Sequence, residues 1–198
     1  MGLDFTYIEG QSPLDEEEKE GLKIKSISTR GELDEFEQHN IEKAIEWSIR
    51  RKFTIDEFLT EQFVKDLHKQ MFDQVWIWAG QFRKSNKNIG VDKFYICIEL
   101  RQLLDDCKFW IKENTFSEDE IAIRLKHRMV KIHPFPNGNG RHSRLIADIM
   151  IERIFGKKLF SWGVKNLSKQ SDTRKTYINA VIEADNGNYK PLLKFARS

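Results

Sequence analysis

Residues 133–144 read HPFPNGNGRHSR, which combines a histidine, a glycine-rich turn and two arginines within twelve positions. A run of apolar residues at helical spacing follows at once, with Leu145, Ile146 and Ile149 among its members. The stretch therefore predicts a loop that leads into the N-terminus of a helix. This loop and helix form the centre of the predicted fold.

The glycine-rich turn has the properties of an anion-binding loop. Gly138 and Gly140 lack a Cβ atom, so their backbone can turn sharply and approach a ligand closely. The helix that begins near Arg141 adds unpaired N–H groups and the positive end of its dipole. Arg141 and Arg144 are three positions apart and project from nearly the same face of its first turn. Phosphate is the ligand that this arrangement favours.

His133 is the candidate for acid–base chemistry. It precedes Pro134, and a residue before proline is pushed out of the α region, so the preceding helix should end there. An imidazole with a pKa near neutrality can accept a proton from an attacking hydroxyl. A helix stop or a tight turn alone is commonplace, and it is the combination that indicates a site. The stretch is not a Walker A loop, a dinucleotide fingerprint or an HExxH zinc motif.

The stretch resembles the signature of the Fic family, HxFx[D/E]GNGRxxR. His133, Phe135, residues 138–141 and Arg144 are in register with it, whereas Asn137 stands where the family usually has a carboxylate.

The resemblance extends over most of the chain, about residues 36–195. Residues 78–83, WAGQFR, are similar to the family's WAGxxR segment, and residues 88–90, NIG, to the start of its flap hairpin. The opening SPLDEEEKEGL of residues 12–22 and the HPFPNGNGR variant are most similar to the Fic branch called mobile mystery protein B.

The resemblance implies a protein adenylyltransferase, which transfers AMP from ATP to a serine, threonine or tyrosine hydroxyl of a target protein. His133 would be the general base, Arg141 would neutralise the leaving pyrophosphate, and Phe135 would anchor the loop in the core. The nucleotide-binding residues would be Asn137, Gly138, Asn139, Gly140, Arg141 and Arg144, with Arg144 reaching the γ-phosphate.

The resemblance also implies Mg²⁺ beside the ATP co-substrate, with Asn137 in the place of the metal ligand. An amide oxygen lacks the charge of the carboxylate that Mg²⁺ prefers. We therefore expect weak metal binding by Asn137, with the phosphates supplying most of the charge.

Two alternatives stay open. One is Fic-type transfer from another donor, carrying UMP, phosphocholine or phosphate; the kinase-like branch has ANKR where residues 138–141 read GNGR, which favours nucleotidyl transfer. The other is a catalytically silent nucleotide-binding partner or regulator, because Asn137 replaces the carboxylate. The presence of His133 and both arginines favours an active enzyme.

Apolar residues at helical spacing predict helices over most of the chain. Thr60 and Ser117 are expected to begin two of them. A further helix after Leu33 is predicted to turn a semi-apolar stripe inward: Phe36, Asn40, Ala44, Ile45, Ser48 and Ile49.

Residues 82–97 are the one β-like stretch. By resemblance they form a flap whose edge receives a target segment as an added strand, with Phe94, Tyr95 and Ile96 as the docking residues. The predicted fold class is therefore all-α, a Fic-type helical bundle with one small β-hairpin flap. We assign residues 32–198 to the Fic domain.

Residues 1–31 are predicted to be an N-terminal arm with a short acidic helix. Many Fic proteins carry an inhibitory helix of pattern [S/T]xxxE[G/N], whose glutamate pairs with the second signature arginine. Glu20 and Gly21 match its ending, although Glu16 stands where the serine or threonine belongs. The hypothesis from this resemblance is an inhibitory pair between Glu20 and Arg144; a separate small antitoxin-like protein is the alternative inhibitor.

Composition limits the classes of partner. The chain has 198 residues, a net charge of +2 and a pI near 8.4, which gives no basis for electrostatic capture of nucleic acid or a membrane surface. No apolar run reaches spanning length and no signal peptide opens the chain. We expect a cytoplasmic protein whose partner is a protein substrate docked on the flap. Cys97 and Cys107 lack metal-type spacing and are expected to be buried thiols.

Overall fold

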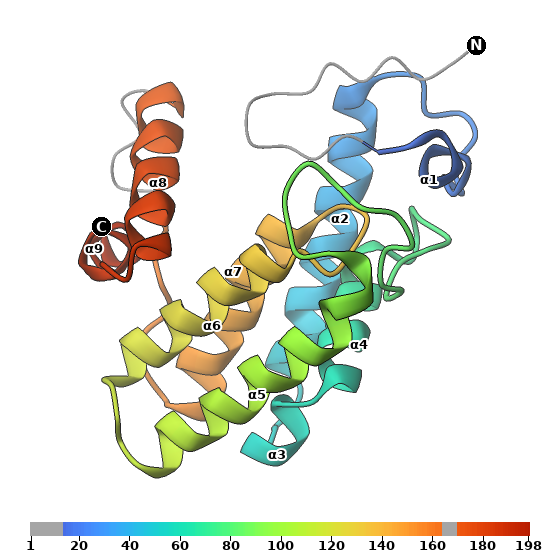
Figure 1. Ribbon diagram of the computed structural model, residues 1–198. Helices are drawn as coiled ribbons and strands as arrows, with labels where there is room; N and C mark the ends of the chain where they lie inside the picture. The colour runs from blue at the N-terminus through green and yellow to red at the C-terminus, as the bar shows by residue number, and fades with distance from the viewer. Residues whose placement is uncertain (1–13, 164–169) are drawn as a thin grey trace.

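The computed structural model describes residues 14–163 and 170–198, and throughout this part of the chain the regular structure is helical (Figure 1). The helices are α1 (Glu16–Glu20), α2 (Arg30–Ile49), α3 (Ile55–Phe58), α4 (Glu61–Phe72), α5 (Ile96–Lys112), α6 (Glu118–Ile132), α7 (Asn139–Ile149), α8 (Gln170–Asp185) and α9 (Lys190–Arg197). A 3₁₀ turn (Lys93–Tyr95) precedes α5, and a π-helical turn (Met150–Ile154) continues α7. The predicted all-α class is confirmed.

Helix starts follow the capping residues in the sequence. The Ser117 side chain accepts a hydrogen bond from the backbone N–H of Glu120 and begins α6, as predicted. Thr60 caps α4 in the same way through the N–H of Phe63. Because these caps satisfy donors that a helix leaves unpaired, they fix where the two helices begin.

The central bundle is formed by α4, α5, α6 and α7, which contact one another side by side, while α2 packs against α4 (Figure 1). The helix pair α8 and α9 lies at one side of this bundle, with α9 contacting α6. Helices α6 and α7 are joined by the signature loop, whose Phe135 is fully buried. The loop is therefore anchored in the core, as the resemblance implied for Phe135.

The described part of the N-terminal segment packs into the same core. Leu14, Leu22 and Ile27 are buried, and Leu22 forms an isolated antiparallel bridge with Trp76. Residues 1–13 of the predicted arm lie outside the described residues. The short acidic helix predicted in this segment is present as α1, which is capped by Asp15.

The prediction of a β-hairpin is wrong. Residues 82–97 contain no strand; Asp92 accepts a hydrogen bond from the N–H of Phe94, starting the 3₁₀ turn that continues into α5 at Ile96. The guanidinium of Arg83 donates to the carbonyls of Ser85 and Val91. Side chains thus satisfy backbone groups that a strand ladder would otherwise pair.

The three residues predicted to dock a target segment differ in their exposure to solvent. Phe94 and Tyr95 are exposed, at 79% and 58%, whereas Ile96 is 1% exposed and belongs to the core. Ile96 therefore cannot present its side chain to a partner in this conformation.

Half of the stripe predicted for the helix after Leu33 faces the core, because Asn40, Ala44 and Ser48 are buried. Phe36, Ile45 and Ile49 are exposed. The buried face of α2 is formed by Leu33, Glu37, Asn40, Ile41, Ala44 and Ser48. The buried face thus includes a glutamate, Glu37, whose carboxylate lies beside Arg141 of the signature.

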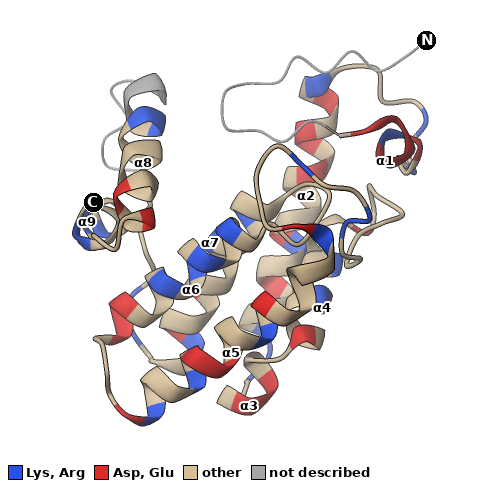
Figure 2. Cartoon of the chain, in the orientation of Figure 1, with Lys and Arg blue, Asp and Glu red and all other residues tan. Residues whose placement is uncertain are grey.

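Charged side chains of both signs alternate along most helices in the view of Figure 2, while α1 is mainly acidic. No described helix combines the length and apolar character that crossing a bilayer requires.

Candidate active site

The signature loop turns between α6 and α7 through two residues in the left-handed conformation. His133 ends α6 with φ 56°, and Gly138 begins α7 with φ 76°. A Cβ atom at Gly138 would lie 2.5 Å from Cζ of Phe72, so both conformation and space require glycine there. A Cβ atom at Gly140 would meet nothing within 4 Å. The space beside the first turn of α7 is therefore open, as an approaching ligand requires.

The Asn139 side chain holds the loop together. Its Oδ1 accepts from the N–H of Phe135 (2.9 Å) and its Nδ2 donates to the carbonyl of the same residue (2.8 Å). The side chain is 2% exposed. Because both ends of the amide are engaged, we expect Asn139 to meet a phosphate through its backbone N–H.

His68 on α4 is a second support of the loop. Its Nδ1 accepts from the N–H of Gly80 (3.0 Å), so its Nε2 carries the proton and donates to the carbonyl of Asn137 (3.1 Å). The ring stacks on Phe135 with centroids 3.7 Å apart. Burial, with His142 nearby, holds the pKa of His68 well below its usual value, so the ring is neutral. The sequence indicated only a structural role for this histidine; its contact with the loop required the fold.

His133 is 6% exposed and is covered by residues 83–92. A Cβ atom at Gly90 would lie 2.7 Å from Cβ of His133, and the Arg83 guanidinium donates from Nε to the His133 carbonyl (2.7 Å). Burial lowers the pKa of His133 to about 4, and the charges of Arg83 and Lys87 act in the same direction. The imidazole is therefore neutral at pH 7, the form that can accept a proton.

Arg141 is held by a glutamate that the sequence analysis did not single out. Its Nη1 lies 2.7 Å from Oε2 of Glu37 on α2, although the two groups are misaligned for a hydrogen bond. Oε1 of Glu37 accepts from the Trp76 indole N–H (2.6 Å), and Glu37 is 1% exposed. The signal available in the sequence was the spacing of Leu33, Glu37 and Ile41, which places one charge inside an apolar stripe.

Arg144 points in a different direction from Arg141. Its guanidinium lies over the ring of Tyr177 on α8, 4.6 Å from the centroid, and Nε is buried without a hydrogen-bond partner. The hypothesis of an ion pair between Glu20 and Arg144 is not met in this conformation: Glu20 is exposed, and across the described ranges these two side chains form no salt bridge. The buried glutamate of α1 is Glu18, which pairs with Lys87 beside the signature histidine.

Asn137 was predicted to take the place of the metal ligand. Its Oδ1 accepts from the adjacent N–H of Gly138 (2.6 Å). Within residues 14–163 and 170–198, no group of three or more His, Cys, Asp or Glu residues could hold a metal ion. A lone, already hydrogen-bonded amide oxygen is a poor donor set for Mg²⁺. The residues present do not form a magnesium site by themselves.

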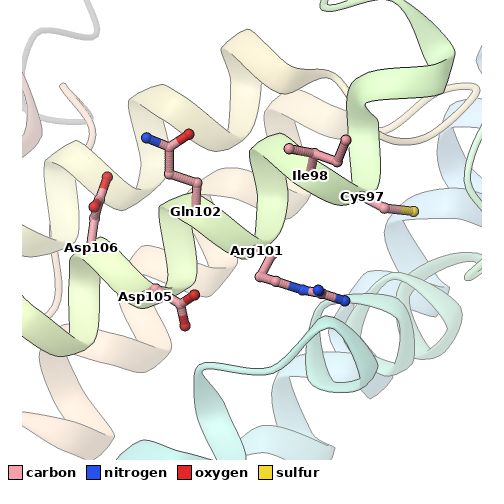
Figure 3. A pocket seen from close by; sticks show the side chains of 6 residues that line it. All are labelled: Cys97, Ile98, Arg101, Gln102, Asp105 and Asp106. Atoms are coloured by element: carbon pink, nitrogen blue, oxygen red, sulfur yellow. The ribbon is translucent and has the colours of Figure 1, made fainter.

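A groove on α5 lies apart from the signature. Figure 3 shows its lining side chains, all on one helix: Cys97, Ile98, Arg101, Gln102, Asp105 and Asp106. Cys97 is exposed, contrary to the expectation of a buried thiol, whereas Cys107 is buried. The groove contains none of the signature residues and does not enter the candidate site.

The site thus joins a neutral buried imidazole to a glycine-rich helix N-terminus with two nearby guanidinium groups. Residues 58–151 match the model of the Fic/DOC family. This chain carries a Fic domain. The family assignment made from the signature is confirmed.

Similarity to named proteins supports the same conclusion. The Aedes aegypti "Protein adenylyltransferase Fic" is 25% identical over 144 residues, which are 71% of this chain and 27% of that protein. The chain thus matches about a quarter of the length of that curated relative.

Solved Fic structures share the fold. Fic-1 (residues 134–508) from Caenorhabditis elegans superposes with a TM-score of 0.69 at 20% identity, covering 90% of this chain and 51% of that chain. BepC from Bartonella tribocorum, solved with bound AMPPNP, has a TM-score of 0.67 at 18% identity and covers 92% of this chain and 97% of that one.

Proposed function

We propose that this Fic domain transfers AMP from ATP to a hydroxyl group of a protein. The proposal rests on the position of the neutral His133 imidazole. His133 directly precedes the loop that leads into the N-terminus of α7, and the space beside Gly140 in the first turn of that helix is open. The curated relative named as a protein adenylyltransferase supports the reaction class.

In the proposed reaction the phosphates lie against the first turn of α7, where unpaired N–H groups and the helix dipole favour anions. The imidazole of His133 removes the proton from a serine, threonine or tyrosine hydroxyl. The hydroxyl oxygen forms a bond to the α-phosphorus while the bond from that phosphorus to the α,β-bridging oxygen breaks. Pyrophosphate leaves with the electron pair.

Two movements are needed for this reaction. Residues 83–92 cover His133, so a target hydroxyl reaches the imidazole only when this cover shifts. Arg141 is paired with Glu37, so it stabilises pyrophosphate only when it exchanges that carboxylate for phosphate oxygens. We propose that the exposed Phe94 and Tyr95 help to dock the target segment at this edge.

The test is incubation with a cell lysate and either α-³²P-ATP or γ-³²P-ATP. Protein label from the α-position alone, lost in His133→Ala, is the expected result. His39→Ala is the matched control, because His39 is an exposed histidine on α2 far from the signature in sequence. Label from the γ-position alone would instead indicate phosphate transfer.

A silent nucleotide-binding protein is the second candidate, and the replacement of the carboxylate by Asn137 is the observation that favours it. It predicts ATP binding with no label from either position. Asn137→Asp would then be the first variant to test for restored transfer.

A further inference from the structure

Arg83 carries a guanidinium group that is buried beside the signature histidine. The residue is 3% exposed, and its three nitrogen atoms each donate to a backbone carbonyl: Nε to His133 (2.7 Å), Nη1 to Ser85 (2.8 Å) and Nη2 to Val91. A buried charge is costly unless hydrogen bonds replace the water that it loses. Here three carbonyl oxygens do so, and one of them belongs to the proposed base.

Main-chain hydrogen bonds strengthen the same connection. Three consecutive carbonyls, those of residues 132–134, accept from the segment that covers His133. The N–H of Val91 donates to Ile132 (3.3 Å), and the N–H of Arg83 donates to Pro134 (2.9 Å). The carbonyl between them, that of His133, accepts from the Arg83 side chain. Arg83 thus provides two of the three hydrogen bonds, and the cover is attached to the signature on both sides of the histidine.

The backbone of His133 is in a conformation that depends on such support. Its φ of 56° and ψ of 58° lie in the left-handed region, which a residue with a Cβ atom adopts only at a cost. A Cβ atom built at Gly90 would lie 2.7 Å from Cβ of His133 and 3.1 Å from Nη2 of Arg83, so the cover contacts both residues closely. Because the backbone sets where Cβ points, the direction of the imidazole is coupled to the guanidinium group.

We propose that Arg83 is a positioning residue for the transfer reaction: its guanidinium group fixes the backbone of His133 and the two ends of the cover as one unit. The inference rests on the proposed function, because Arg83 acts only through the base. With its ends held at Arg83 and Val91, the cover admits a target by movement of the residues between them, and the imidazole keeps its direction while they move.

The shape of the guanidinium group suits this role as much as its charge does. Its donors lie in one rigid plane and point in different directions, whereas a lysine ammonium is a compact point charge on a flexible stem. Three carbonyls from three parts of the main chain require donors with such fixed directions. Arg83→Lys therefore keeps the charge and removes the connection between the cover and His133.

The first measurement is the initial rate of protein labelling by α-³²P-ATP in a fixed amount of lysate, at increasing ATP concentration. In Arg83→Lys we expect the maximal rate to fall by about 10- to 100-fold, the effect of a misplaced catalytic group. The ATP concentration at half-maximal rate should stay within about twofold of the wild-type value, because the phosphates bind at α7. Arg50→Lys, at an exposed position directly after α2, is the matched control and should label at the wild-type rate.

Rescue of Arg83→Ala by a small guanidinium compound tests the same group in another way. The variant loses the side chain beyond Cβ, and ethylguanidinium contains the atoms that are lost. We expect millimolar ethylguanidinium to raise the maximal rate of Arg83→Ala several-fold. Ethylammonium, which has the charge without the planar fork, should not.

The third measurement needs neither nucleotide nor target. Diethyl pyrocarbonate modifies accessible imidazoles, and mass spectrometry follows each histidine separately. In the wild type His133, at 6% exposure, should react much more slowly than the exposed His39. Arg83→Lys should raise the rate at His133 several-fold, because the cover is no longer held, and leave the rate at His39 unchanged. The fully buried His142 should stay unreactive in both proteins, which shows that the core is folded.

Two results would overturn the positioning role. One is a maximal labelling rate, or a rate of His133 modification, that Arg83→Lys leaves unchanged. The other is reaction of His142 together with a raised half-maximal ATP concentration, which would show that Arg83 only supports the fold. Failure of the proposed function would look different, because the wild-type chain would then label no protein, while the modification of His133 would still report whether Arg83 holds the cover.

Discussion

Glu37 is the residue whose position most changes the interpretation of the site. Its carboxylate is 1% exposed, forms an ion pair with Arg141 and accepts a hydrogen bond from the Trp76 indole. Removing one partner of a buried ion pair usually leaves the charge of the other partner buried and uncompensated. Here, however, Arg141 is about one-third exposed, so water and phosphate can replace the carboxylate.

Glu37→Gln should therefore increase ATP affinity and AMP transfer by several-fold. The amide retains an acceptor for the Trp76 indole and removes the charge that competes with phosphate. Calorimetric titration with ATP and the α-³²P label provide the two measurements. Glu35→Gln, an exposed position on the same helix, is the matched control, and Glu20→Gln tests the hypothesis made from the sequence.

We expect both control variants to behave like the wild type. If Glu37→Gln has wild-type affinity and transfer while Glu20→Gln raises them, the inhibitory carboxylate lies on α1 and this account of Arg141 is wrong.

Helix α7 is the element on which the proposed phosphate binding depends. Its start contains two glycines, Gly138 and Gly140, and each is suited to its position for a different physical reason. Gly138 needs its left-handed backbone and the space taken by Phe72, whereas Gly140 has a helical environment and open space. The first glycine serves the fold, and we propose that the second serves the ligand.

Substituting each glycine by alanine should separate these effects. Gly138→Ala should lower the free energy of unfolding by about 2 kcal/mol or more, because strain and a steric clash add. Gly140→Ala should raise it by about 0.5–1 kcal/mol through helix propensity, yet weaken ATP binding. Urea denaturation and calorimetry measure the two quantities. Wild-type ATP affinity in Gly140→Ala would mean that the phosphates do not approach this turn.

The elements also show what the sequence could predict. The caps Ser117 and Thr60 and the stop before Pro134 are local, and the helix boundaries that they predicted are confirmed. The prediction of a hairpin was wrong because the side chains of Arg83 and Asp92 form hydrogen bonds with the backbone of Ser85, Val91 and Phe94. Such side-chain contacts leave no periodic pattern in the sequence from which they could be predicted. In α2 the prediction was right for Asn40, Ala44 and Ser48 but missed Glu37, a charged residue on the buried face.

The candidate site was predicted only as far as one continuous motif extends. His133 and both arginines lie within that motif, and the structure brings them to one loop and one helix. Their partners come from α2 and α8, and neither contact could be inferred from separations of about a hundred and about thirty residues.

For the whole molecule, buried neutral histidines link stability to pH. Burial lowers the pKa of both His133 and His142 from 6.5 to about 4, and the pKa of His68 is also lowered. The unfolded chain therefore binds more protons than the folded chain between these values. The stability that these groups contribute is complete above pH 6.5 and falls as the pH drops toward 4, by up to about 3 kcal/mol for each of His133 and His142.

Urea denaturation at pH 7.0, 5.5 and 4.5 measures this slope. His142→Gln should flatten it while keeping a donor for the Val64 carbonyl, and His39→Gln, at an exposed position, should leave it unchanged. A free energy of unfolding that stays constant from pH 7.0 to 4.5 would show that the histidines are not buried in the neutral form.

We propose above all that this Fic domain attaches AMP to protein hydroxyls with His133 as the base. The most direct measurement is tandem mass spectrometry of peptides from a lysate incubated with ATP and either the wild type or His133→Ala. We expect adenosine monophosphate esters on serine, threonine or tyrosine that form with the wild type and are absent with His133→Ala. The same esters at equal yield with His133→Ala, or peptides that carry phosphate alone, would contradict AMP transfer with His133 as the base.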